Sequence, residues 1–172
     1  MEITIADLSD LDRLYEFYKE VILHQKEDLY SAKWTLDVYP AREDIVEHLQ
    51  NDAYYIMEED GQIIAAACIC HHDDEIYKDV KWTVPCKDNE VMVIHLLAVS
   101  PEYRGRGLSY ELLKKIIEDG RNTSKAIHLD VVKGNLPAFE LYKKAGFHYI
   151  GEEEIFYEDT GRILFDLMEY IY

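Results

Sequence analysis

The chain is poor in basic residues, in cysteine and in long apolar runs, and each shortage excludes a class of protein. Its 172 residues include 18 Lys and Arg against 35 Asp and Glu, which gives a formal net charge of −17. Binding to a nucleic-acid backbone or to an anionic membrane needs clustered positive charge, so we expect neither partner. Three cysteines are too few, and odd in number, for a disulfide framework, which favours a reducing compartment and hence the cytoplasm.

Segments that would anchor or divide the chain are also lacking. The longest apolar stretch, residues 63–70, has eight residues, whereas a membrane helix needs about 20. The first residues show no basic region followed by an apolar run, so we expect no targeting segment. No repeat and no Ser/Pro/Gly-rich linker interrupts a composition that is 48% apolar. The sequence therefore predicts one globular domain over residues 1–172.

Apolar periodicity predicts seven strands and four helices. Strands are expected over residues 2–5, 53–58, 63–70, 91–99, 126–132, 147–156 and 163–171, and helices over 8–25, 41–50, 107–120 and 136–145. Turns with Asp-Gly at 60–61 and Asp159-Thr160-Gly161 indicate two hairpins. The run 91–99 is apolar almost throughout, which is typical of a central strand buried on both faces. This order predicts a mixed sheet with helices on both faces, of the α/β or α+β class.

One segment combines the features of an anion-binding site. Residues 97–109, LAVSPEYRGRGLS, lead from the central strand into the start of a helix. Gly105 and Gly107 allow a tight turn and a close approach of a ligand, and the N–H groups at the helix start attract a phosphate. Arg104 and Arg106 add positive charge. The patterns of the P-loop and of the dinucleotide fingerprint are not met, and a plain strand-to-helix turn with solvated arginines is the alternative.

Two blocks of the sequence resemble known motifs in the expected order. Arg104-x-x-Gly107-x-Ser109 is similar to Q/R-x-x-G-x-G/A, with Ser where Gly or Ala is usual, and residues 135–147, NLPAFELYKKAGF, are similar to N-x-x-A-x-x-L-Y-x-x-x-G-F. In both blocks the chain resembles the GNAT superfamily of acetyl-CoA-dependent N-acetyltransferases. The resemblance implies a mostly antiparallel sheet. It also implies transfer of an acetyl group to a primary amine of a small molecule or peptide, by direct attack in a ternary complex.

The resemblance also implies where acetyl-CoA binds. Backbone groups of residues 97–99 would pair with the pantetheine arm as if it were an added strand between the strands at 91–99 and 126–132. Asn135 would hydrogen-bond this arm or cap its own helix, and both roles stay open. The residues expected to contact the cofactor are Leu97, Ala98, Val99, Arg104, Gly105, Arg106, Gly107, Leu108, Ser109, Asn135 and Tyr142, those from Arg104 to Ser109 at the pyrophosphate.

Acetyl transfer needs a proton donor for the departing thiolate and a way to deprotonate the amine. The resemblance assigns the donor role to Tyr142, although this tyrosine is also suited to the packed face of a helix. His95, two residues before Leu97 and so expected on the same strand face, is the first candidate for the base, as in the arylalkylamine branch of the superfamily. The alternative to this catalytic role is that His95 is a buried core residue whose hydrogen bond is satisfied within the protein. Glu90 is the second candidate, and bound water alone is a third; the oxyanion would lie at the backbone N–H near Val99.

Aromatic residues outside the motifs are candidates for contact with the acceptor amine. Trp34 and Tyr39 follow the first helix, in a segment that usually covers the acceptor site in this superfamily, and Trp82 lies in a polar, irregular stretch. They are expected either to bind an apolar part of the substrate or to pin a loop to the core. A terminal hairpin often pairs subunits in the superfamily, which leaves a homodimer open.

The sequence also contains a cluster that invites a metal interpretation. Residues 68–74, CICHHDD, start with two cysteines, but no second pair of ligands follows at zinc spacing, so we expect core thiols and no metal site. Two further functions stay open for a chain of this fold. One is an acetyl-CoA sensor without turnover, and the other is an interaction domain whose 14 tyrosines and acidic faces bind a basic partner.

Overall fold

The structure, a computed structural model, describes residues 1–25, 28–73, 75–157 and 161–172. Its strands are β1 (Glu2–Ile5), β2 (Ala53–Glu59), β3 (Gln62–Cys70), β4 (Val91–Val99), β5 (Ala126–Val132), β6 (His148–Tyr157) and β7 (Gly161–Ile171). Its helices are α1 (Leu11–Gln25), α2 (Arg42–Asn51), α3 (Leu108–Gly120) and α4 (Leu136–Ala145), with short 3-10 turns at Leu8–Asp10, Glu75–Tyr77 and Pro101–Tyr103. The predicted fold class is confirmed, and the helix and strand limits agree closely with the expected ones. Asp74, Asp159 and Thr160 lie outside the described residues.

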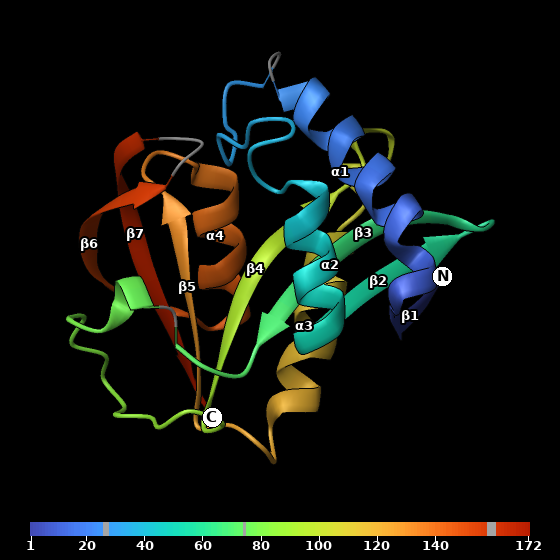
Figure 1. The fold of residues 1–172 in the computed structure, drawn as a ribbon. Helices are drawn as coiled ribbons and strands as arrows, with labels where there is room; N and C mark the ends of the chain where they lie inside the picture. The colour runs from blue at the N-terminus through green and yellow to red at the C-terminus, as the bar shows by residue number, and fades with distance from the viewer. Residues whose placement is uncertain (26–27, 74, 158–160) are drawn as a thin grey trace.

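The seven strands form one sheet in the order β1-β2-β3-β4-β5-β7-β6 (Figure 1). Neighbouring strands pair antiparallel except β4 and β5, which are parallel because α3 crosses over between them. β4 lies in the middle of this order, and Val91 to Ile94 are all buried, as its apolar run predicts.

Helices cover both faces of the sheet and define two cores. One core joins the apolar sides of α1 and α2 to the sheet, with the buried residues Leu14, Tyr18 and Ile45 at its centre. The other joins α3 and α4 to the opposite face, with Leu112 and Ile116 fully buried. Each helix buries the residues that recur at three- and four-residue spacing, because these lie on one side of a helix with 3.6 residues per turn.

A bulge in β4 separates this strand from β5. The two strands pair only from Val91↔Ala126 to Val93↔His128, and beyond this point they diverge (Figure 1). At the bulge, Leu96 adopts a φ of 56°. The hydroxyl of Tyr18 donates a hydrogen bond of 2.7 Å to the backbone carbonyl oxygen of Leu96. Beyond the last pair, no strand in the described part of the chain pairs with β4 on the β5 side.

The bulge corrects one expectation from the sequence. His95 and Leu97 do not share a strand face, since the register against β3 shifts between Ala66↔Ala98 and Cys68↔His95. A bulge adds one residue, so the alternation of side chains is broken there. His95 therefore stacks on His48 of α2, with ring centres 6.2 Å apart, whereas Leu97 packs on the side of α3 and α4.

Candidate active site

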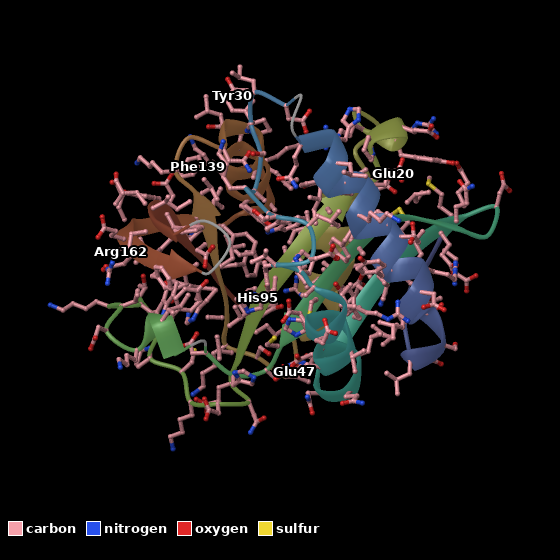
Figure 2. The ribbon with its side chains drawn as sticks, turned by 45° about the horizontal axis from the view of Figure 1, so that its top comes forward. Glu20, Tyr30, Glu47, His95, Phe139 and Arg162 are labelled. Carbon is pink, nitrogen blue, oxygen red and sulfur yellow. The ribbon has the colours of Figure 1, made fainter. Side chains whose placement is uncertain are left out.

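A cavity of about 630 Å³ lies where β4 and β5 diverge. It is bounded by the segment between α1 and α2, by α2, by the end of β3, by β4 and β5, and by α4. Among the described residues it is lined by Ala32, Trp34, Tyr39, Glu47, His48, Asn51, Asp52, Cys70, His72, Asp73, Ile94, His95, Leu96, Leu97, Asp130, Val131, Val132, Asn135, Ala138, Tyr142 and Phe165. Figure 2 shows His95 near the middle of the molecule, with Glu47 of α2 close to it in this view. The cavity thus joins the α2 side of the sheet to the α4 side.

The loop before α3 is built around two glycines that need a left-handed backbone. Gly105 and Gly107 have φ values of 77° and 79°, a region that residues with a side chain adopt at a cost. Gly107 is also the N-cap of α3 and offers no side chain to the N–H groups of the first helical turn. A Cβ atom at either glycine would meet nothing within 4 Å, so the loop surface is open to a ligand. This is the geometry that the sequence predicted for a pyrophosphate.

The two arginines of this loop are paired with carboxylates. Arg104 forms an ion pair of 2.7 Å with Asp28, and Arg106 lies 3.8 Å from Glu59 and over the ring of Tyr103. Both arginine side chains are more than a third exposed. Exposed ion pairs contribute little to stability, so an anionic ligand could replace these carboxylates at small cost.

Asn135 fulfils the role of a helix cap and also lines the cavity. Its side-chain oxygen accepts a hydrogen bond of 3.4 Å from the backbone N–H of Ala138, at the start of α4. The two roles that the sequence left open are therefore compatible.

Tyr142 on α4 is buried against the second core and lines the cavity from that side. Burial raises the pKa of its hydroxyl well above the ordinary 10, and the charge of Asp130 acts in the same direction. Asp130 itself accepts a hydrogen bond of 2.6 Å from Tyr77. The tyrosine is consequently held in its protonated form, which a proton donor requires.

On the α2 side, His95 belongs to a group of polar side chains that the sequence did not predict. His48 lies between Asp52, whose carboxylate is 2.8 Å from its Nδ1 atom, and the stacked ring of His95. Cys70 makes side-chain hydrogen bonds with Cys68, His48 and His95. The bond from Cys68 is the main reason why the pKa of the Cys70 thiol is lowered, and burial opposes this shift.

The charge of His48 follows from the same contacts. Burial lowers the pKa of its imidazole, but the hydrogen bonds with Cys70 and Asp52 outweigh burial and raise this pKa to about 9. Since the pKa of the Cys70 thiol is lowered at the same time, these contacts favour the imidazolium form of His48 and the thiolate form of Cys70.

Carboxylates dominate the charged lining of the cavity. Glu47, Asp52, Asp73 and Asp130 line it, whereas no Lys or Arg does so among the residues that the structure describes. Asp52 and Asp73 each contact a histidine, and Glu47 stands exposed on α2. A cationic group would therefore be favoured in this cavity over an anionic one.

Two of the residues predicted for catalysis and acceptor binding, Glu90 and Trp82, do not line the cavity. Among the residues predicted to contact the cofactor, Ala98, Val99 and residues 104–109 are also outside its described lining. The carboxylate of Glu90 pairs with Lys125 at 2.8 Å and accepts from the backbone N–H of Lys87. Trp82 packs instead on the ring of His128, with centroids 3.7 Å apart and planes nearly parallel. Trp34 and Tyr39, by contrast, line the cavity as expected.

The stacking of Trp82 on His128 connects the segment between β3 and β4 to the sheet. His128 on β5 is fully buried, with Asp73 at 2.7 Å on one nitrogen and Glu169 at 3.4 Å on the other. Glu169, also fully buried, accepts hydrogen bonds from the backbone N–H groups of Thr83 and Val84. This network positions Asp73, which lines the cavity.

Comparison with known proteins places this chain in a family. The model of the Acetyltransferase (GNAT) family matches residues 11–147, most of the chain. The chain therefore belongs to this family of acetyltransferases. The resemblance in the two sequence motifs is thereby confirmed at the level of the family. Within the described part of the chain, no helix is long and apolar enough to cross a membrane.

Individual relatives fall in the same group. The chain is 28% identical over 148 residues to an uncharacterized N-acetyltransferase of Methanocaldococcus jannaschii, which covers 84% of this chain but 58% of that protein. It is 27% identical to a candidate [ribosomal protein bS18]-alanine N-acetyltransferase of Bacillus subtilis, over 90% of this chain and 85% of that one.

Solved structures share the fold over almost the whole chain. A GNAT-family acetyltransferase of Streptococcus pneumoniae superposes with a TM-score of 0.73 at 20% identity and covers 99% of both chains. A candidate acetyltransferase of Salmonella typhimurium, solved with its cofactor acetyl-CoA, has a TM-score of 0.72 at 16% identity, over 99% of this chain and 93% of that one. At these identities the likeness concerns the fold.

Proposed function

We propose that this chain transfers the acetyl group of acetyl-CoA to a primary amine that carries a further positive charge. The observation that carries the proposal is the cavity, which is lined by Tyr142 of α4 and by four carboxylates, two of them, Glu47 and Asp52, from α2 and its C-cap. Family membership supports the reaction type and the cofactor. The charge of the lining supports the choice of acceptor, which can be a small molecule or a peptide.

The cofactor would bind along β4 and at the start of α3. Among the described residues, no strand pairs with β4 on the β5 side beyond Val93, and the backbone groups of residues 97–99 would pair with the amides of the pantetheine arm. The N–H groups around Gly107 would hold the pyrophosphate, with help from Arg104 and Arg106 once these leave their carboxylates. This arrangement would put the thioester beside Tyr142.

The reaction would need two proton transfers at opposite sides of the cavity. The neutral amine attacks the thioester carbonyl, a C–N bond forms, and the C–S bond then breaks. Tyr142 gives its proton to the departing CoA thiolate, and its buried hydroxyl is protonated for this purpose. His95 accepts the proton that the amine nitrogen loses, directly or through a water. His95 is preferred over Glu90 because it lines the cavity, whereas Glu90 is paired with Lys125 outside it.

Acetyl-CoA turnover with matched amines tests this proposal. CoA release, followed with a thiol reagent, would be measured for monoamines and diamines of equal chain length, and for short peptides with or without a neighbouring lysine. We expect the dicationic acceptors to have the higher kcat/KM. Turnover that does not distinguish them would refute the choice of acceptor. Micromolar binding of acetyl-CoA without CoA release on any amine would favour a sensor instead.

A pair of variants on α2 tests the role of charge. Glu47→Gln removes a carboxylate of the cavity, and Glu43→Gln removes one from the same helix that does not line it. An exposed charge pair contributes about 0.2–1 kcal/mol, so Glu47→Gln should raise the KM of a dicationic amine about 1.5- to 5-fold. The KM of the Glu43→Gln variant should equal that of the unaltered chain.

The free cysteines and the terminal hairpin bear on the compartment and the assembly of the chain. The three cysteines are free thiols, as expected of a protein kept in the reducing cytoplasm. Gel filtration with light scattering would report whether the terminal hairpin of β6 and β7 pairs two chains.

A further inference from the structure

The group of side chains between α2 and β3 has the composition of a metal site. One ligand atom each from His48, Asp52, Cys68 and Cys70 lies within 4.8 Å of every other. His48 and Asp52 are one helical turn apart at the C-terminal end of α2, and Cys68 and Cys70 are two residues apart on β3. The sequence could not reveal this set, since the second pair of ligands comes from a helix earlier in the chain and not from the residues that follow the cysteines.

We propose that His48, Asp52, Cys68 and Cys70 bind a zinc ion. Two sulfur atoms, an imidazole and a carboxylate form a mixed donor set of the kind that Zn²⁺ binds in proteins. Magnesium and calcium prefer sites made of oxygen atoms, so they do not fit this group.

The geometry allows a tetrahedral ion without rearrangement of the fold. Zinc binds sulfur at about 2.3 Å and nitrogen at about 2.0 Å, so tetrahedral ligand atoms are about 3.3–3.8 Å apart. Separations of up to 4.8 Å therefore need a contraction of about 1 Å, within reach of side-chain rotation. The ligands stand on a helix and a strand, whose backbones hold them in place.

The surroundings give an ion access to the four ligands and hold the ligands in place. His48, Asp52 and Cys70 line the cavity, which gives an ion a path from solvent, whereas Cys68 is fully buried behind them. His95 stacks on His48 and hydrogen-bonds Cys70, so it would support two of the ligands from the side of β4. An ion at this point would occupy the α2 side of the cavity and would compete there with a cationic acceptor.

Titration with cobalt and zinc tests the proposal directly. The full chain, freed of any affinity tag, reduced and stripped of metal, would be titrated with Co²⁺, whose tetrahedral thiolate complexes absorb strongly in the near ultraviolet. Zn²⁺ would then displace it in competition with a chelating dye. We expect one ion per chain and a charge-transfer band that Zn²⁺ abolishes. Absence of the band, together with no zinc retained at one equivalent, would overturn the proposal.

The third cysteine provides a matched control. Cys86 is half-buried, lies outside the group and directs its thiol toward the carbonyl oxygen of Val84. Loss of a residue that supports a ligand weakens metal binding about 10- to 100-fold. Cys70→Ser removes a ligand itself and should weaken Zn²⁺ binding by more than this, whereas Cys86→Ser should leave Zn²⁺ binding unchanged. Equal affinity of the unaltered chain and the Cys70→Ser variant would refute the site.

Thiol alkylation gives an answer that does not depend on whether a variant folds. In the unaltered chain, Zn²⁺ should slow the alkylation of Cys70, which lines the cavity, relative to the metal-free chain and leave the rate at Cys86 unchanged, as peptide mass spectrometry would show. Cys68 is fully buried and should react slowly in both states. Equal rates at Cys70 with and without Zn²⁺ would contradict the proposal. None of these measurements uses acetyl transfer, so their failure would leave the proposed function unaffected.

Discussion

The glycine at the start of α3 offers the sharpest test of where the cofactor binds. Gly107 has a φ of 79°, and an alanine in this left-handed region costs about 1–2 kcal/mol of folding free energy. For a chain of this length that corresponds to a fall in Tm of about 2–8 °C. A Cβ atom at this position would meet no protein atom within 4 Å, so the loss of stability comes from backbone strain and not from a clash.

Binding of acetyl-CoA should suffer in addition to stability. A methyl group on Gly107 would keep the pyrophosphate from the N–H groups of the loop and weaken one or more hydrogen bonds to a charged group. Each such bond contributes about 1.5–3 kcal/mol, so the Kd should rise about 10- to 150-fold. Isothermal titration calorimetry well below the Tm would measure the Kd, and differential scanning calorimetry would measure the stability.

Gly61 supplies the control for backbone strain. It lies in the turn between β2 and β3 and has the same φ of 79°, with nothing within 4 Å of a Cβ atom. Gly61→Ala should therefore lose a similar amount of stability but keep its affinity for acetyl-CoA. The reasoning fails if the Gly107→Ala variant binds the cofactor like the unaltered chain, or if both variants lose affinity equally.

Two further predictions concern a proton donor and a buried network. Tyr142→Phe should lower kcat about 10²- to 10⁴-fold with little change in the KM for acetyl-CoA, because it removes a proton and almost no volume. Since burial raises the pKa of Tyr142 above 10, the unaltered chain should show no loss of kcat from this group up to pH 10; a Tyr142→Phe variant of normal kcat would exclude the role. His128→Asn should lower the free energy of unfolding by about 1–3 kcal/mol in urea titrations, because Asp73 would lose its hydrogen-bond partner at 2.7 Å. A loss well below about 1 kcal/mol would show that this contact contributes little to stability.

The parts of the site that lie in one stretch of chain could be predicted from the sequence. The loop with Gly105 and Gly107 and the helix cap at Asn135 depend on local backbone chemistry, which leaves a mark in the order of residues. Tyr142 could be identified from the motif that contains it, and it lines the cavity from its position on α4.

The parts that depend on distant contacts could not be predicted. The bulge in β4 has no glycine to mark it; Leu96 takes its positive φ while the hydroxyl of Tyr18, 78 residues earlier, binds its carbonyl oxygen. The assignment of His95 to a strand face failed for this reason. Likewise, no local pattern in the sequence marks His48, and only the packing of α2 on the sheet brings it to Cys70.

The divergence of β4 and β5 opens a cavity that is lined by residues from both α2 and α4. If acetyl-CoA enters from the side of α3 and α4 and the amine from the side of α2, neither substrate blocks the other's way in or out. Such a molecule has no structural reason to enforce an order of binding. A used CoA could leave while the acetylated product is still held, and an inhibitor that joined both substrates would have to thread through the sheet.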